Sequence, residues 1–464
     1  MRHGWPLHRV FFPGIALAAL CTMIVGSVLP DGRAVQAAGP RQTHQPVTLT
    51  FAVEFTDAPT AALTYKYIIN PFQQKYPWVT VKLVQQNGAA AIDKYLKTSI
   101  TAGAGPDVFD ENGPSWMAPF ADAHQLLPLD KFAKQFGWAK KILPFAYQTS
   151  FYHGSLISLP SESETLHLWY NKTVFDKYGW KPPATFDQLI TLGKAIQSKG
   201  LIPFGFGASD CAPCWEWWQS WALNAYLGPQ GLYKLLTGKT PWTDPAVAKA
   251  MTMLKQLWDL GFISKKQAAA LSFNDGWGLF GSQKAVMKME GTWGFSPGLI
   301  FHYGKGFTWS IAPLPTWRAG VPAWPPIGIG EVEGINAATK HPDEAALFLN
   351  WFFQSPKANG QWIYALASTW APPLKYSADD LPAGTNPLFK QVLLSDEQAM
   401  LTGKAGYLAW SAWPAKTEAY MWSNAESVLY GALSIPSFLQ GMDKQFKAEQ
   451  SAGGLPTLPA PAAK

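Results

Sequence analysis

Charged residues are scarce in this chain. Asp, Glu, Lys and Arg make up 15% of its 464 residues, against about one quarter in an average soluble domain. Lys and Arg form no run interleaved with aromatic residues, which argues against nucleic-acid binding. Beyond residue 37 the only arginines are Arg41 and Arg318. A phosphate site needs Arg or a cluster of helix N-terminal amides, so the scarcity of Arg argues against an anionic ligand.

Cysteine is also rare, with three residues in the whole chain. Two of them, Cys211 and Cys214, are separated by two residues, and no second pair exists, so we expect no zinc site. Eight scattered histidines give no metal-binding or triad spacing, and we expect no cofactor. In an oxidising compartment Cys211 and Cys214 would close a small disulfide loop. We favour this over a redox CxxC motif, because no apolar strand precedes the pair.

Only one long hydrophobic run is present, over residues 11–29, and it follows a basic segment with Arg2 and Arg9. Small residues after the run fit cleavage behind Ala37, so we expect a signal peptide over residues 1–37 and an exported protein. An uncleaved membrane anchor is the alternative, because the run is nearly long enough to span a bilayer. Removing residues 1–37 takes away three Arg and one Asp, which lowers the net charge from +6 to about +4.

The third cysteine, Cys21, lies inside this apolar run. A lipidated cysteine follows a small residue, whereas Cys21 follows Leu20. We therefore expect the mature protein on the periplasmic or extracellular face of the cell membrane, with no lipid anchor at Cys21.

Tryptophan is abundant instead, with 23 residues, and aromatic residues reach 14% of the chain. The length predicts about two to three domains, each able to bury a core. The composition excludes a disordered, collagenous or coiled-coil chain. Because one core does not require so many indoles, we interpret the surplus as part of a recognition surface.

The first part of the mature chain alternates strands and helices. Strand patterns over Val47–Val53, 79–84 and 105–110 are separated by helical patterns. This order predicts an α/β fold with a mainly parallel sheet between helices. Ligands of such sheets bind at the carboxyl ends of the strands. The residues at these ends are Glu54, Asp110, Glu111 and Asn112.

Four short strings occur in a familiar order and spacing. They are Gly-Pro-Asp-Val at 105–108, Leu-Trp-Tyr-Asn-Lys at 168–172, Gly-Thr-Trp at 291–293 and Gly-Ile-Asn-Ala-Ala at 334–338. Together they resemble the extracellular solute-binding proteins of ABC importers, in the sugar-binding group that includes the maltose-binding protein. The resemblance covers nearly the whole mature chain, about residues 47–447.

This resemblance implies two α/β lobes, each with a mainly parallel sheet flanked by helices, joined by a hinge that the chain crosses three times. We expect the crossings near 160–161, 311–312 and 368–370. The expected division of the chain assigns residues 38–160 and 312–368 to lobe one and residues 161–311 and 369–450 to lobe two. The tail over 451–464 is rich in Gly, Pro and Ala, and we expect it to be disordered.

The resemblance also implies aromatic residues in a cleft between the lobes, because the C–H faces of sugars pack on aromatic rings. Trp218, Trp221 and Trp293 match positions where the family keeps such residues. Trp370 and Trp422 are further candidates. The alternative for each is a place in the core of a lobe.

Sugar hydroxyl groups need acceptors, which carboxylates and amides supply. Glu164 resembles a ligand-binding glutamate of the maltose-binding protein. Glu54, Glu111 and Asn112 belong to the opposite lobe, and Glu331 is a further candidate for the cleft. The alternative for each carboxylate is a solvated or salt-bridged place on the surface.

Two classes of function remain. The resemblance implies a monomeric binding protein, not an enzyme, whose lobes close on a sugar or oligosaccharide before the closed form docks on an ABC permease. The alternative is a secreted glycoside hydrolase that uses paired carboxylates such as Glu162 and Glu164. A third possibility is the same fold with another polar solute as its ligand.

Overall fold

The computed structural model describes residues 44–56, 58–296, 298–366 and 371–463. The predicted signal peptide, the crossing expected at 368–370 and the candidate Trp370 lie outside these residues. Every described helix and strand belongs to the unit Pro46–Lys464. Within the described part of the chain, no helix combines the length and the apolar character that a membrane span requires.

The first sheet has the strand order β2-β1-β3-β12-β6. Its strands are β1 (Val47–Val53), β2 (Val79–Gln85), β3 (Val108–Glu111), β6 (Leu159–Pro160) and β12 (Val332–Ile335). Strand β1 is parallel to β2 and β3, as predicted, whereas β12 is antiparallel to β3 and β6. Leu49 and Phe51 are buried while Thr48 is exposed, so alternation along β1 sets which residues enter the core.

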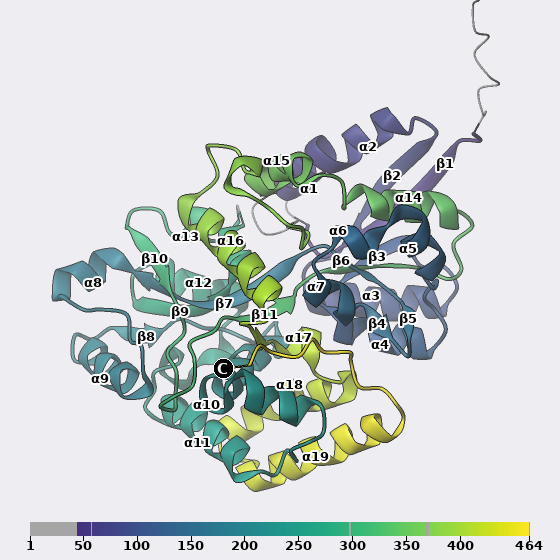
Figure 1. Ribbon diagram of the computed structural model, residues 1–464. Helices are drawn as coiled ribbons and strands as arrows, with labels where there is room; N and C mark the ends of the chain where they lie inside the picture. The colour runs from purple at the N-terminus through teal and green to yellow at the C-terminus, as the bar shows by residue number, and fades with distance from the viewer. Residues whose placement is uncertain (1–43, 57, 297, 367–370, 464) are drawn as a thin grey trace, which may run out of the picture. The chain divides into compact units, whose positions relative to one another are not determined.

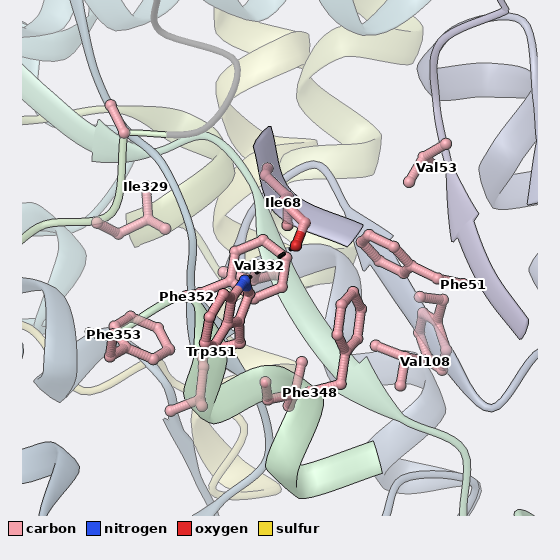
Figure 2. Close-up of a cluster of buried hydrophobic side chains, with 14 of the residues drawn as sticks. Phe51, Val53, Ile68, Val108, Ile329, Val332, Phe348, Trp351, Phe352 and Phe353 are labelled. Carbon is pink, nitrogen blue, oxygen red and sulfur yellow. Dashed lines mark hydrogen bonds between the residues drawn. The ribbon is translucent and has the colours of Figure 1, made fainter. Parts of the chain in front are cut away.

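Segments far apart in the sequence form the core of the first lobe (Figure 2). Helix α14 (Pro342–Trp351) lies beside β1 and β12, although some 290 residues separate it from β1 (Figure 1). The ring centroids of Phe348 and Phe352 lie 5.3 and 6.2 Å from that of Phe51. The Trp351 indole donates a hydrogen bond of 3.0 Å to the Ile68 carbonyl. The first lobe is therefore discontinuous in sequence.

The other elements of this lobe are mostly short helices. They are α1 (Ala58–Thr64), the π-helix η1 (Tyr65–Ile69), α2 (Asn70–Lys75), α3 (Ala89–Thr101), α4 (Pro114–Asp122), α5 (Asp130–Phe136), α6 (Trp138–Lys141), α7 (Pro144–Thr149), the hairpin of β4 (Phe151–Tyr152) and β5 (Ser155–Leu156), and α15 (Pro356–Leu366). Several begin with a proline, which has no amide hydrogen to leave unpaired there.

The second sheet has the order β13-β11-β7-β9-β8, and β10 also pairs with β7. Its strands are β7 (Ser163–Asn171), β8 (Ile202–Phe204), β9 (Ala285–Gly291), β10 (Trp309–Ala312), β11 (Pro326–Ile329) and β13 (Gly406–Tyr407). Strand β7 is antiparallel to β9, β10 and β11, whereas β8 is parallel to β9 and β13 to β11. All strands except β7 therefore run in one direction.

Most helices that follow β7 along the chain pack around this second sheet. They are α8 (Lys172–Tyr178), α9 (Phe186–Gln197), η2 (Ala212–Cys214), α10 (Trp215–Leu236), α11 (Pro245–Asp259), η3 (Ser264–Lys266), η4 (Ala268–Ala270), α12 (Phe273–Gly281), η5 (Thr292–Phe295), α13 (Ile300–Tyr303), α16 (Pro387–Thr402), α17 (Ala409–Ala412), α18 (Ala415–Leu429) and α19 (Ile435–Ser451). The short helix η7 (Ala378–Asp380) contacts α15 of lobe one instead. The long helix α10 is kinked at Gly228, directly before Pro229.

The chain passes between the two sheets in two short extended segments. Residues 161–162 connect β6 to β7, and residues 330–331 connect β11 to β12. Each segment passes straight from one sheet into the other, and the strand that arrives runs antiparallel to its new neighbours. Strands β7 and β12 are thus the antiparallel strands of their sheets.

The expected second crossing, at 311–312, is wrong. Strands β10 and β11 both pair with β7, so residues 312–329 belong to lobe two and the crossing lies at 330–331. The segment after β10 does leave the sheet, but it returns to the same sheet. The boundary at 369 also needs correction, because Leu143 donates its amide hydrogen to the carbonyl of Pro373 and Leu374 bridges Ile142. Residues 371–381 therefore pack on lobe one.

The tail after α19 is not disordered, contrary to our expectation. Leu455 and Leu458 pack against the core of lobe two. The Tyr407 hydroxyl donates to the Pro459 carbonyl at 2.6 Å, and the Ala462 amide donates to the Gly403 carbonyl at 2.8 Å. Proline disfavours helix and sheet but leaves carbonyl acceptors free, so this composition also suits a strap that lies over β13.

We expect a chain truncated after Gly454 to lose stability. The deletion removes two half-buried leucines and several hydrogen bonds, which together contribute about 2–4 kcal/mol. Thermal unfolding followed by circular dichroism would measure the loss as a melting temperature lowered by several degrees. Deletion of residues 463–464 alone is the matched control and should change nothing. Equal melting of both truncated chains would contradict the packing of the strap.

Candidate functional site

The two crossing segments lie side by side and bring glutamates of both lobes together. The Ser161 amide donates to the Glu331 carbonyl at 2.9 Å, and the Gly330 amide donates to the Glu162 carbonyl at 3.0 Å. A Cβ atom on Gly330 would lie 2.0 Å from the Glu164 carboxyl carbon. Only glycine therefore leaves room for the Glu164 side chain against this crossing.

The ends of the first-sheet strands add further polar groups, as the sequence predicted. Glu54 follows β1, Glu111 ends β3 and Asn112 comes next. The Asn112 amide donates a hydrogen bond of 3.0 Å to the Glu54 carboxylate. Glu54 and Asn112 are half-buried and Glu111 is buried. These candidates lie together because β1 and β3 are adjacent parallel strands.

The electrostatics of this cluster follow from burial and from like charge. Burial raises the pKa of Glu331 well above its usual range, and the carboxylates of Glu54, Asp110, Glu162 and Glu164 raise it further. These neighbours come from both lobes, so the site spans the hinge. Burial likewise raises the pKa of Glu54, Asp110, Glu111 and Glu164. The cluster cannot be fully ionised without donors that face it.

An aromatic wall borders the carboxyl groups. The half-buried ring of Trp293 lies 4.9 Å from the ring of Trp217 and 5.9 Å from that of Trp410, measured between centroids. Burial raises the pKa of Glu164, and contact with Trp410 lowers it in part. The Trp293 indole donates a hydrogen bond to Glu290. The structure thus places one predicted tryptophan, Trp293, beside the predicted glutamates.

Two other predicted tryptophans lie elsewhere. Trp218 and Trp221 are each 1% exposed and belong to the core of lobe two. The Trp221 indole donates to the Pro315 carbonyl at 3.2 Å, and the Trp218 ring packs 5.3 Å from that of Phe204 in β8. Both face the sheet, and Trp217, one residue before Trp218, is rotated by about 100° around α10 toward Trp293.

Trp217, Trp410 and Glu290 were not among the predicted site residues. Trp217 lies in the tryptophan-rich start of α10, next to the predicted Trp218, and the surplus of indoles was the only signal for Trp410. Glu290 directly precedes the Gly-Thr-Trp string, but its role depends on which face of β9 it occupies. Trp422 is half-buried on α18, one turn after Glu418, and stays a candidate.

Contacts across the lobes continue beside the cluster. The Ser115 hydroxyl at the start of α4 donates to the Trp413 carbonyl at 2.7 Å. Ser115 and Trp116 also face Glu418 of α18, which shares its buried site with Glu216. Gly113 has φ 97°, and a Cβ there would lie 2.3 Å from the Trp410 carbonyl oxygen. The lobes are therefore closed on one another in this structure.

The predicted disulfide is confirmed. Cys211 and Cys214 are joined, with their Cα atoms 5.4 Å apart, across η2 at the start of α10. The bridge constrains the segment that leads into Trp215 and Trp217. Among the described residues, no three His, Cys, Asp or Glu side chains are arranged to hold a metal ion.

Glu333 provides a test of the buried acids. Burial raises the pKa of Glu333 to about 8, against the effect of a hydrogen bond with Ser161. Because its pKa is higher in the folded protein than the usual value of about 4.3, its contribution to stability is complete below about pH 4 and is lost as the pH rises toward 8. We expect the melting temperature to fall from about pH 5 to about pH 8, and to fall less in Glu333→Gln.

Differential scanning fluorimetry across this pH range would measure both profiles. Glu426→Gln makes the same chemical change at an exposed position of α18 and should keep the wild-type slope. If Glu333→Gln and the wild type lost stability in parallel, the raised pKa of Glu333 would be refuted.

Comparison with known proteins agrees with this fold. Curated relatives include the maltotriose-binding protein of Pyrococcus abyssi, 27% identical over 274 residues, and an uncharacterized ABC transporter extracellular-binding protein of Pyrococcus horikoshii, 24% identical over 284 residues. The matches cover 57% and 60% of this chain, and the chain spans 54% and 63% of the two relatives. The multiple sugar-binding protein of Streptococcus mutans is 26% identical over 304 residues, 62% of this chain and 67% of that protein.

Solved structures share the two-lobed fold over most of the chain. A chitin oligosaccharide binding protein superposes with a TM-score of 0.73 at 22% identity, over 88% of this chain and 99% of that one. A solute-binding protein in complex with raffinose gives 0.64 at 20% identity, over 87% and 99%. The sequence model of the bacterial extracellular solute-binding proteins matches residues 57–359. The chain belongs to this family of bacterial extracellular solute-binding proteins.

Proposed function

We propose that this protein captures a sugar or oligosaccharide between its lobes and delivers it to the membrane permease of an ABC importer. One observation carries the proposal: carboxyl groups from both lobes converge at the crossings beside the ring of Trp293. Relatives named for maltotriose, multiple sugars and diacetylchitobiose support the same class of ligand.

The chemistry of the site suits a polyhydroxylated ligand. Glu54, Glu164 and Glu331 offer acceptors, and hydroxyl groups that donate to them would replace the water lost on burial. The indole of Trp293 offers an apolar face for the C–H side of a sugar ring. A sugar combines hydroxyl donors with an apolar C–H face in one small molecule, so it fits both parts of this site.

The same site disfavours an anion. Lys288 is the only buried basic side chain in the described part of the chain, and it pairs with Glu290 at 3.0 Å. A phosphate or carboxylate would therefore meet acids without a free cation to neutralise it. We infer that the ligand is not an anion.

Closure follows from the position of the site. Glu111, Glu164 and Glu331 are buried where the lobes meet, so a ligand reaches them only when the lobes move apart. A ligand that contacts both lobes then stabilises the closed form. The crossing segments are the natural hinge, because few residues there need to change conformation.

We further propose that the protein binds its ligand without cleaving it, acts as a monomer, and is exported by the signal peptide expected over residues 1–37. The glycoside hydrolase alternative requires Glu162 and Glu164 to act as an acid and a nucleophile. Chromatographic analysis of an oligosaccharide incubated with the purified protein decides between the two. A released product would refute pure binding.

We expect Trp293→Ala to weaken sugar binding by about thirtyfold or more, because an aromatic anchor of a binding site contributes at least about 2 kcal/mol. A thermal-shift screen with maltotriose, raffinose and chitin and xylan oligosaccharides would first find the ligand, which adds about 2.7 kcal/mol of stability at a hundredfold its Kd. Isothermal titration calorimetry then compares the variants.

Trp180→Ala is the matched control, since Trp180 is also half-buried but packs on Phe175 and Tyr178 away from the carboxyl cluster. This variant should bind like the wild type. Flat melting with every sugar would oppose the carbohydrate proposal, and equal affinity of the two variants would remove Trp293 from the site.

A further inference from the structure

Strand β9 carries an ion pair in an unusual place. Lys288 and Glu290 lie on β9, an inner strand of the second sheet between β7 and β8, and every residue of β9 is buried. Alternate residues of a strand project to the same side, so the two side chains meet, with Lys288 Nζ 3.0 Å from the Glu290 carboxylate. Lys288 Nζ also donates to the Gly205 carbonyl at 3.2 Å and lies 4.7 Å from the centre of the Trp277 ring.

Stability alone does not explain this pair. Burial raises the pKa of Glu290 and lowers that of Lys288, and each partner opposes the shift of the other. A buried ion pair of this kind is generally no more stabilising than apolar side chains of similar size. Its distinctive effect is to provide a fixed, charged acceptor within a chain that has few charges.

That acceptor holds Trp293. The Trp293 indole donates its hydrogen bond to the Glu290 oxygen that faces it, while the other carboxylate oxygen faces Lys288. A Cβ atom on Gly291 would lie 2.0 Å from the Trp293 ring, so the ring lies directly over the Gly291 backbone. Trp217 closes another side, at 4.9 Å between ring centroids. The orientation of the ring is thus fixed by the hydrogen bond of its N–H and by its contacts with Gly291 and Trp217.

We propose that Glu290, itself held by Lys288, is the positioning residue that fixes the Trp293 ring for ligand stacking, an inference that rests on the proposed sugar-binding function. Glu290 does not need to touch the ligand. Without it, the Trp293 indole loses its buried acceptor, and the ring rotates away from the orientation in which a flat sugar face packs on it. The specificity for a ligand then depends on a pair of residues below the binding surface.

The test separates positioning from folding. Glu290→Gln alone would leave the Lys288 charge buried without a partner, which can prevent folding. Two double variants avoid this: Lys288→Met with Glu290→Leu removes both charges and the acceptor, and Lys288→Met with Glu290→Gln removes both charges but keeps an amide acceptor. Glu449→Gln changes a buried glutamate that caps α18 through the amides of Lys416 and Thr417, and it serves as the stability control.

The first measurement needs no ligand. In an NMR spectrum of isotope-labelled protein, the indole N–H signal of Trp293 is identified by its loss in Trp293→Phe. We expect this signal to move upfield in the double variant that carries Glu290→Leu, to stay hydrogen-bonded in the one that carries Glu290→Gln, and to be unchanged in Glu449→Gln. An unchanged signal without the acceptor would overturn the proposal, whether or not any sugar binds.

The second measurement is the affinity for the sugar that the thermal-shift screen identifies. We expect a loss of about tenfold or more when leucine replaces Glu290 in the double variant, and recovery to within about threefold when glutamine replaces it. Adding Trp293→Ala to the leucine variant should cost no more than Trp293→Ala alone, because both changes remove the same stacking. Additive losses, or weakened binding by Glu449→Gln of equal size, would overturn the proposal.

Discussion

Two extended chain segments lie side by side between the sheets, and the rest of the site depends on their pairing. Backbone hydrogen bonds join Ser161 to Glu331 and Gly330 to Glu162. Each segment has two residues between strands and continues straight from one sheet into the other, so that β7 and β12 run antiparallel to their new neighbours. The same pairing places glutamates of both lobes within interaction distance. The proposed hinge and the proposed binding site are therefore one structure.

This arrangement has an electrostatic cost that gives the site its chemistry. Carboxyl groups that face one another under burial bind protons more tightly than usual, as Glu331 and Glu164 do. The free-energy cost of their burial and mutual repulsion falls when the lobes open to water, when the carboxyl groups are protonated, or when a ligand donates hydrogen bonds to them. Of these, only the ligand also bridges the lobes. Because the closed state is unfavourable when its carboxyl groups are ionised, the free energy of closure depends on whether a hydrogen-bond donor occupies the site.

The sequence predicted those parts that follow from local pattern. Parallel strands β1 and β3 had to bring Glu54, Glu111 and Asn112 to one edge, because strand alternation and the β-α-β order define that edge. The second crossing was not predictable in this way, since the chain runs straight through Gly330 and Glu331 without a turn signal. The sequence also could not show which face of α10 is turned toward the core. Neighbouring tryptophans on a helix point in directions that differ by about 100°, and only the position of β8 decides that Trp218 faces the core.

The surplus of tryptophan consequently means something different from what its number suggests. Trp169, Trp218, Trp221 and Trp277 are almost fully buried and act as large core residues, so most indoles say nothing about a ligand. Trp293 differs from these residues in the contacts that hold its ring, a hydrogen bond to Glu290 and packing on the Gly291 backbone. A half-exposed ring on a flexible loop would lose conformational entropy on binding a ligand, whereas the ring of Trp293 has lost this entropy already. A few oriented rings, supported by charges buried below them, matter more for recognition than the count of aromatic residues.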